Sequence, residues 1–188
     1  MADSLLGSLE RSLTKDTSET GPASPRLCGD IDIRIARDGT WFYHGSPIGR
    51  KPLVRLFAGV LHRDAEGAFW LETPAEKCRI RVDDAPFTAV EMTVAGAGRD
   101  QVLSFRTNVD DFVSAGEKHP LRIAVDGPTG EPSPYILVRD RLEALIVRAV
   151  YYDLVALGVE DRIAGDAAYG AWSGGVFFPL EEAGIAEG

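Results

Sequence analysis

Basic side chains grouped in an otherwise acidic chain have the clearest potential for chemistry. One stretch without any acid holds five of them: Arg50, Lys51, Arg55, His62 and Arg63. Because Pro52 suits the first turn of a helix, the positive end of that helix would lie in this stretch and could hold an anion. The alternative is a solvated helix face whose charges pair with acids elsewhere in the chain.

A second set of arginines, Arg139, Arg141 and Arg148, accompanies the apolar run from Leu142 to Leu157. We expect this run to form a long helix that is buried on several sides, with Arg148 facing an interface. A buried guanidinium needs an anion close by. That anion could be Asp83 or Asp84, or the phosphate or carboxylate of a ligand, which a guanidinium fork fits well.

Other reactive side chains do not form a recognisable catalytic or metal-binding pattern. Ala171–Gly175 nearly matches the Gly-x-Ser-x-Gly nucleophile motif, but all three histidines precede Ser173, whereas that enzyme class has its histidine after the serine. The histidines have no metal-ligand spacing. Asp30 and Asp32 would share one strand face and could hold a divalent cation, although a wet strand face is the simpler interpretation. We therefore expect no catalytic residues, no metal and no cofactor.

Cys28 and Cys78 are the two cysteines, fifty positions apart, and neither belongs to a Cys-x-x-Cys motif. This spacing is typical of neither a zinc site nor a redox motif. We expect two reduced, unlinked thiols that pack as small apolar side chains.

Composition describes the class of protein. The 188 residues include 20 Lys and Arg against 29 Asp and Glu, a net charge of −9. This balance argues against binding to nucleic acid through phosphate contacts. No apolar run reaches the roughly 18–20 residues of a membrane span, and the first residues lack the basic segment of a secretory signal. These features predict a cytoplasmic protein.

Periodicity predicts the elements that must position these side chains. Residues 4–14 have a leucine stripe typical of a helix, and a polar linker follows to residue 27. Alternation over Asp30–Ile35, then Asp38-Gly39 and Trp41–Tyr43, predicts a hairpin. Apolar residues at helical spacing follow Pro52. Strands are expected at 69–72, 79–82 and 87–94, with a turn at 83–86 between the last two.

An internal similarity suggests a duplication. Arg34–Gly39 recurs as Arg122–Gly127 with five of six residues identical, and both copies precede a Ser-Pro pair, a helix and an aromatic strand. We interpret this as a duplicated β-β-α-β unit, giving an α+β fold of two small sheet-and-helix subdomains packed together. The expected divisions are 1–27, 28–96 and 97–188.

Three stretches, Asp38–Ile48, Glu76–Phe87 and Tyr135–Leu145, resemble the bacterial domain-of-unknown-function family 1285. The resemblance covers residues 28–180. It implies two related repeats, the second similar to a pleckstrin-homology-like domain, with a ligand site between them. It implies no established reaction, and so no catalytic residues.

From these observations we expect a non-catalytic binding protein. Its ligand would be a small anionic or nucleotide-like molecule in the cleft between the repeats, and the binding could serve signalling. The side chains expected to hold the ligand's charge are Arg50, Arg55, Arg139 and Arg148, and those expected to form its apolar or stacking walls are Trp41, Phe87 and Tyr151. The alternatives are a protein–protein interaction module and, third, an unrecognised hydrolase.

Overall fold

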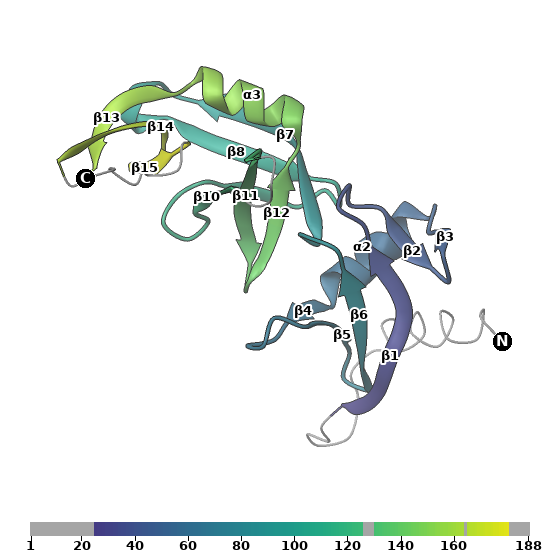
Figure 1. Cartoon of the computed structure of the whole chain (residues 1–188). Helices are drawn as coiled ribbons and strands as arrows, with labels where there is room; N and C mark the ends of the chain where they lie inside the picture. Colours follow the sequence, from purple (N-terminus) through teal and green to yellow (C-terminus); the bar gives the residue numbers. More distant parts are fainter. Residues whose placement is uncertain (1–24, 126–129, 164, 181–188) are drawn as a thin grey trace. The chain divides into compact units, whose positions relative to one another are not determined.

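The structure, a computed structural model, describes residues 25–125, 130–163 and 165–180. The chain divides into two compact units between Asp84 and Ala85 (Figure 1). The expected helix at 4–14 and the Asp126-Gly127 turn lie outside the described residues.

The first unit is one six-stranded sheet and one helix. Its elements are β1 (Arg26–Ile35), β2 (Trp41–Tyr43), β3 (Ser46–Pro47), α2 (Lys51–Gly59), β4 (Leu61–Arg63), β5 (Phe69–Glu72) and β6 (Glu76–Val82). The strand order is β3-β2-β1-β6-β5-β4. β1 and β6 are parallel neighbours at the centre, and all other pairs in this sheet are antiparallel.

Alternating apolar residues bury one face of this sheet, as the sequence predicts. Ile33 and Ile35 on β1 are almost fully buried, while Arg34 between them faces outward. The ring of Trp41 stacks on that of Phe57 from α2, with their centroids 6.2 Å apart. α2 therefore packs on the apolar face of the sheet and does not cover the opposite face, which carries Arg34.

The predicted Asp38-Gly39 hairpin is confirmed. Gly39 has a φ of +82°, a left-handed conformation that glycine adopts without strain, and its N–H donates to the carbonyl of Ala36. The carboxylate of Asp38 accepts a hydrogen bond from the backbone N–H of Thr40 at 2.9 Å, which lowers the pKa of Asp38.

The second unit contains a six-stranded sheet, a three-stranded sheet and a helix. Its elements are β7 (Phe87–Ala95), the short 3₁₀ helix η1 (Gly98–Asp100), β8 (Val102–Thr107), β9 (Phe112–Ser114), β10 (Leu121–Val125), β11 (Pro132–Arg139), β12 (Leu142–Ile146), α3 (Arg148–Ala156), β13 (Val159–Ile163), β14 (Asp166–Ser173) and β15 (Val176–Pro179). The sheet orders are β10-β11-β12-β7-β8-β9 and β13-β14-β15.

The two six-stranded sheets have the same topology. In each, three antiparallel strands run from the centre to one edge, the chain continues at the opposite edge, and three more strands return to the centre. The last strand then lies parallel to the first, β6 beside β1 and β12 beside β7. The chain is thus a two-domain, repeat-like protein. It is mostly β, and in the described residues its α-helices are α2 and α3, so α+β describes it only loosely.

The strands that correspond between the two sheets are not the ones that the sequence similarity predicts. The similarity of Arg34–Gly39 to Arg122–Gly127 aligns β1 with β10, but β1 lies at the centre of its sheet and β10 at an edge. Topology pairs β1 with β7 instead. β7, placed in the first repeat by the expected boundary at residue 96, pairs with β8 and β12 of the second sheet. The connection at residues 83–86 accordingly joins two sheets and is not a hairpin turn.

The prediction of one long helix from Leu142 to Leu157 was wrong for its first residues. Residues 142–146 form β12, in which Leu142, Ala144 and Ile146 are buried at alternate positions. A tight turn at Asp140 and Arg141, both with positive φ, joins β12 to β11. The helix begins only at Arg148. An apolar run fits a buried strand or a buried helix equally well, and strand pairing decided between them.

The expectation of two free thiols was also wrong, because Cys28 and Cys78 form a disulfide with their Cα atoms 5.1 Å apart. They come from the neighbouring strands β1 and β6, where Gly29 is in register with Cys78. This adjacency could not be read from a spacing of fifty residues. Within the described residues, the two helices are too short to cross a membrane.

Removing the ring of Phe57 tests how α2 is held. We expect Phe57→Ala to lower the free energy of unfolding by about 3–5 kcal/mol, because it leaves a cavity beside Trp41. Denaturant unfolding, followed by tryptophan fluorescence, measures this change. The exposed control Glu66→Gln should change it by less than about 0.5 kcal/mol, and an equally small effect of Phe57→Ala would contradict the packing.

Candidate functional site

The seven side chains expected to bind a ligand are divided between the two units. Trp41, Arg50 and Arg55 belong to the first unit, and Phe87, Arg139, Arg148 and Tyr151 to the second. Trp41 and Phe87 are almost fully buried, so within their own units they serve as core residues. Arg50 and Arg55 are exposed at the first turns of α2, where Arg50 is the N-terminal capping position.

Arg139 and Phe87 do lie together. The guanidinium of Arg139 is 5.1 Å from the centroid of the Phe87 ring and donates a hydrogen bond of 2.6 Å to the carboxylate of Asp111. This arrangement is an ion pair that covers an aromatic core residue. Tyr151 also has a structural contact, since its hydroxyl donates to the carbonyl of Leu180 at 3.2 Å.

Arg148 is not buried, contrary to the expectation. Its side chain is 74% exposed, since it lies in the first turn of α3. Its Nε donates to the hydroxyl of Tyr152 at 2.8 Å, which raises the pKa of Arg148, and its Nη1 lies 3.5 Å from the carboxylate of Glu131. Asp83 and Asp84 form ion pairs with Arg34 and Arg37 instead.

Ser173 has a structural role as well. It is fully buried, accepts a hydrogen bond from the backbone N–H of Leu103 and donates one to the carbonyl of Ala115. Both hydrogen-bonding capacities of its hydroxyl are thereby used within the second unit. The resemblance to a nucleophile motif therefore reflects a buried serine beside the Gly174-Gly175 turn, where both glycines have positive φ.

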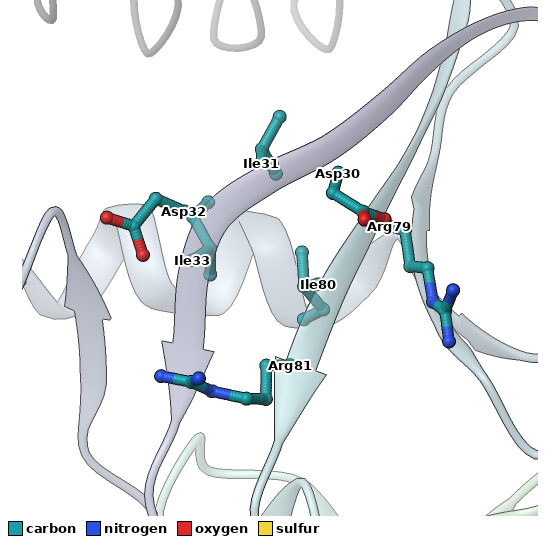
Figure 2. Close-up of a pocket in the computed structure, with 7 residues that line it drawn as sticks. All are labelled: Asp30, Ile31, Asp32, Ile33, Arg79, Ile80 and Arg81. Atoms are coloured by element: carbon teal, nitrogen blue, oxygen red, sulfur yellow. The ribbon is translucent and has the colours of Figure 1, made fainter.

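An open pocket of about 550 Å³ lies between β1 and β6 in the first unit, at a place the sequence analysis did not single out. Asp30 is in register with Arg79 and Arg34 with Arg81, so three residues of β1 lie opposite the single residue Ile80. The strands separate around these extra residues. Such bulges re-aim side chains and occur often near functional sites. Figure 2 shows the lining residues, which are Asp30, Ile31, Asp32, Ile33, Arg79, Ile80 and Arg81.

Asp32 attaches the extra residues of β1 to the neighbouring hairpin. Its carbonyl accepts a hydrogen bond of 3.0 Å from the backbone N–H of His44, and its carboxylate lies 3.1 Å from the Nδ1 of the same histidine. His44 has a φ of +46° in the turn between β2 and β3. The β1 side of the pocket is thus held from outside the β1–β6 pair.

The basic side of the pocket comes from β6. Cys78 and Ile80 are buried, so Arg79 and Arg81 project from the opposite, exposed face. Figure 2 shows the Arg81 side chain extending toward β1 and that of Arg79 extending away from it. Among the residues that the structure describes, neither arginine forms a hydrogen bond or an ion pair.

Arg34, next to Arg81 in the sheet, provides the contrast. Its Nε donates to both carboxylate oxygens of Asp83 at 2.9 Å, and its Nη2 contacts the same carboxylate. These hydrogen bonds lower the pKa of Asp83 and raise the pKa of Arg34. The charge of Arg81 also helps to lower the pKa of Asp83, but only Arg34 forms the ion pair. Arg34 is therefore neutralised within the fold, whereas the guanidinium groups of Arg79 and Arg81 keep hydrogen-bond donors that an external anion can meet.

The sequence carried a signal for this pair. Cys78–Val82 alternates apolar and basic residues, which puts both arginines on one strand face. What it did not show is the separation from β1, because that depends on register. No cluster of three potential metal ligands occurs among the described side chains.

The fold and this pocket define a class: a mostly β protein of two units, each built on a six-stranded sheet with a central parallel pair. The chain belongs to the DUF1285 family of proteins of unknown function. The family's N-terminal domain matches residues 23–85 of this chain, and the family's C-terminal domain matches residues 86–180. This division agrees with the boundary between the two units.

Two crystal structures of DUF1285 family proteins are similar to this chain. The one from Silicibacter pomeroyi is 52% identical, with a TM-score of 0.81, covering 93% of this chain and 95% of its own. The one from Shewanella baltica is 26% identical, with a TM-score of 0.53, covering 67% of this chain and 91% of its own. A search of curated proteins found no match.

The Arg34–Asp83 pair predicts a pH-dependent contribution to stability. Because the pKa of Asp83 is lowered in the folded state, its contribution is complete well above the ordinary carboxyl pKa of about 4 and is lost as the pH falls through the lowered value. We expect Asp83→Asn to lower the melting temperature modestly at pH 7, with the difference from wild type shrinking toward pH 3. A pH series of thermal melts measures this. A difference that does not change with pH would contradict the ion pair.

The exposure of Arg148 gives a second prediction. Arg148→Ala should leave the thermal midpoint almost unchanged, because the side chain is 74% exposed and its carboxylate contact is equally exposed. Arg139→Ala is the comparison, since it removes the guanidinium that lies over the Phe87 ring and pairs with Asp111, and it should destabilise clearly more. Equal losses in thermal melts would show that Arg148 is structural after all.

Proposed function

We propose that this protein is a non-catalytic cytosolic protein that binds a small anionic or nucleotide-like ligand, and that the anion lies at Arg79 and Arg81. The observation that supports this proposal is a pair of arginines on one face of β6 that line an open pocket and form no hydrogen bond or ion pair with the described residues. Arg81 interacts with Asp83 only at longer range, where its charge helps to lower the pKa of that carboxyl. A cleft between the two repeats, a role in signalling and a pleckstrin-homology-like second unit remain predictions from the sequence.

The spacing of the two guanidinium groups favours a small anion. Residues two apart on a strand are roughly 6.5–7 Å apart along it, which exposed arginine side chains can bridge around one phosphate or carboxylate. Their opposite directions in Figure 2 do not prevent this, because exposed side chains change rotamer within nanoseconds. Asp30 and Asp32 on the β1 side disfavour ligands with many negative charges.

An aromatic surface for a nucleotide-like ligand lies beside this arginine pair. Trp70 on β5 is in register with Arg79 and therefore shares its face of the sheet. Its Nε1 donates to Asp64 at 2.7 Å, lowering the pKa of that carboxyl, and Lys77 lies 5.1 Å from the ring centroid. The ring is thus fixed in place, and a fixed aromatic ring favours stacking.

One observation favours the alternative of a protein–protein interaction module. Phe112 is 72% exposed on β9, which is an edge strand of the second six-stranded sheet. An exposed aromatic on an unpaired edge is suited to a partner strand. Within residues 25–125, 130–163 and 165–180, the other large exposed apolar side chains are dispersed over different elements and do not extend Phe112 into a larger patch.

Neutralising the two arginines tests the proposal. Charge-assisted hydrogen bonds contribute about 1.5–3 kcal/mol, so Arg79→Gln and Arg81→Gln should each weaken binding of inorganic phosphate or adenosine monophosphate roughly tenfold or more. Isothermal titration calorimetry on the full chain measures the affinities. Arg141→Gln, an exposed arginine in the β11–β12 turn, is the matched control and should change nothing. No binding of either anion to the wild type would refute the proposal, and so would binding that both variants retain.

A further inference from the structure

The outer part of β1, Arg26–Asp30, differs from the rest of the strand because it contributes no fully buried side chain. Burial on β1 is confined to Ile33 and Ile35, at the inner end. Leu27, the large apolar residue of the outer part, is 66% exposed. Apolar burial therefore holds the inner end of β1 against the core, but it does not hold the outer part.

Among the strands that the structure describes, the outer part also has one neighbour where the inner end has two. β2 pairs with β1 only at Ile33, Arg34 and Ile35. On its other side, the outer part pairs with β6 from Arg26 opposite Glu76 to Asp30 opposite Arg79, with an irregularity at Cys28. Segments with few buried contacts and exposed backbone hydrogen bonds open at low cost. The covalent bond between Cys28 and Cys78 lies within this pairing.

We propose that the Cys28–Cys78 disulfide is a reducible latch that holds the outer part of β1 against β6 and thereby controls the pocket. The regulatory part of this inference rests on the proposed function, because the pocket lies next to the latch. Its β1 side begins at Asp30, the last residue of the segment that the disulfide secures. In the cytosolic setting proposed above, thiol reductants would open such a bond.

Access favours attack at Cys28. Cys28 is half-buried, whereas Cys78 is 2% exposed. A thiolate of a small dithiol attacks the Sγ of Cys28, the S–S bond breaks, and its electron pair passes to the Sγ of Cys78, which takes up a proton. The second thiol of the reductant then closes its own disulfide and displaces Cys28 as a thiolate, which is protonated in turn. Two electrons and two protons thus pass from the dithiol to the protein.

Reduction should act on the two sides of the pocket unequally. β6 remains paired along its other edge with β5, from Phe69 opposite Ile80 to Glu72 opposite Lys77, so Arg79 keeps its place. Arg81 keeps its place because it is in register with Arg34 at the inner end of β1. The outer part of β1 keeps only its backbone pairing and loses its covalent attachment. Asp32 stays held by His44, so the part of the β1 side that reduction frees is its Asp30 end. A ligand that contacts both sides of the pocket must then reorder that end on binding, which weakens its affinity.

Hydrogen exchange measured by mass spectrometry tests the latch. The full-length protein is compared oxidised, after reduction by dithiothreitol, and as the Cys28→Ser variant, which leaves the buried Cys78 in place. We expect faster exchange at residues 26–30 in the reduced protein and in Cys28→Ser, with β5 and the second unit unchanged. Cys28→Ser should not respond to dithiothreitol. Unchanged exchange at 26–30 after reduction would overturn the latch.

Isothermal titration calorimetry on the same three samples tests whether the latch controls the pocket. The probes are inorganic phosphate and adenosine monophosphate. We expect affinity to fall roughly tenfold on reduction and in Cys28→Ser. Equal affinity in all three samples would overturn control of the pocket while leaving the proposed function intact. Faster exchange at 26–30 together with no binding in the oxidised protein would support the latch, overturn its control of an anion site and refute the proposed function.

Discussion

Each six-stranded sheet depends on the parallel pairing of its first and last strands. β1 lies beside β6, and β7 lies beside β12, at the centre of their sheets. Parallel neighbours cannot be joined by a tight turn, so the four intervening strands must be laid out on the two flanks. This constraint explains why each sheet runs outward along one edge and returns from the other. It also explains why Cys28 and Cys78, fifty residues apart, become neighbours.

In the first unit this central pairing is interrupted, and the interruption generates the features of functional interest. Three residues of β1 lie opposite Ile80, and the strands part to form the pocket. Inward of the gap, Arg34 is neutralised by Asp83. At its two ends, Arg79 and Arg81 project from β6 and form no ion pair with a carboxylate of the described residues, although Arg81 acts on Asp83 at longer range. One irregularity thus separates a structural arginine from two that can bind an anion.

The two copies of the Arg-Ile-Ala sequence show how far local sequence determines structure. Arg34 and Arg122 both project from the outer face of a strand, both approach an in-register aromatic ring on the next strand, Phe42 or Tyr135, and both form a fork with a carboxylate. Yet β1 is a central strand and β10 an edge strand. Similar local sequences produce similar side-chain contacts, because alternation and the adjacent antiparallel strand suffice for them. The position of a strand in its sheet depends on all the strands together.

The sequence by itself determined the strand alternation of β1 and β6, the Asp38-Gly39 hairpin, the helix after Pro52 and the family, because each depends on residues that are close in the chain or on motifs in order. The tertiary structure decided the rest. Whether Leu142–Ile146 is helix or strand depended on pairing with β7 and β11, and the exposure of Arg148 followed from that choice. The repeat register depends on the strand order of both sheets. The disulfide and the pocket depend on which residues of β1 and β6 face each other. That register is a contact between segments about fifty residues apart, and local periodicity carries no information about it.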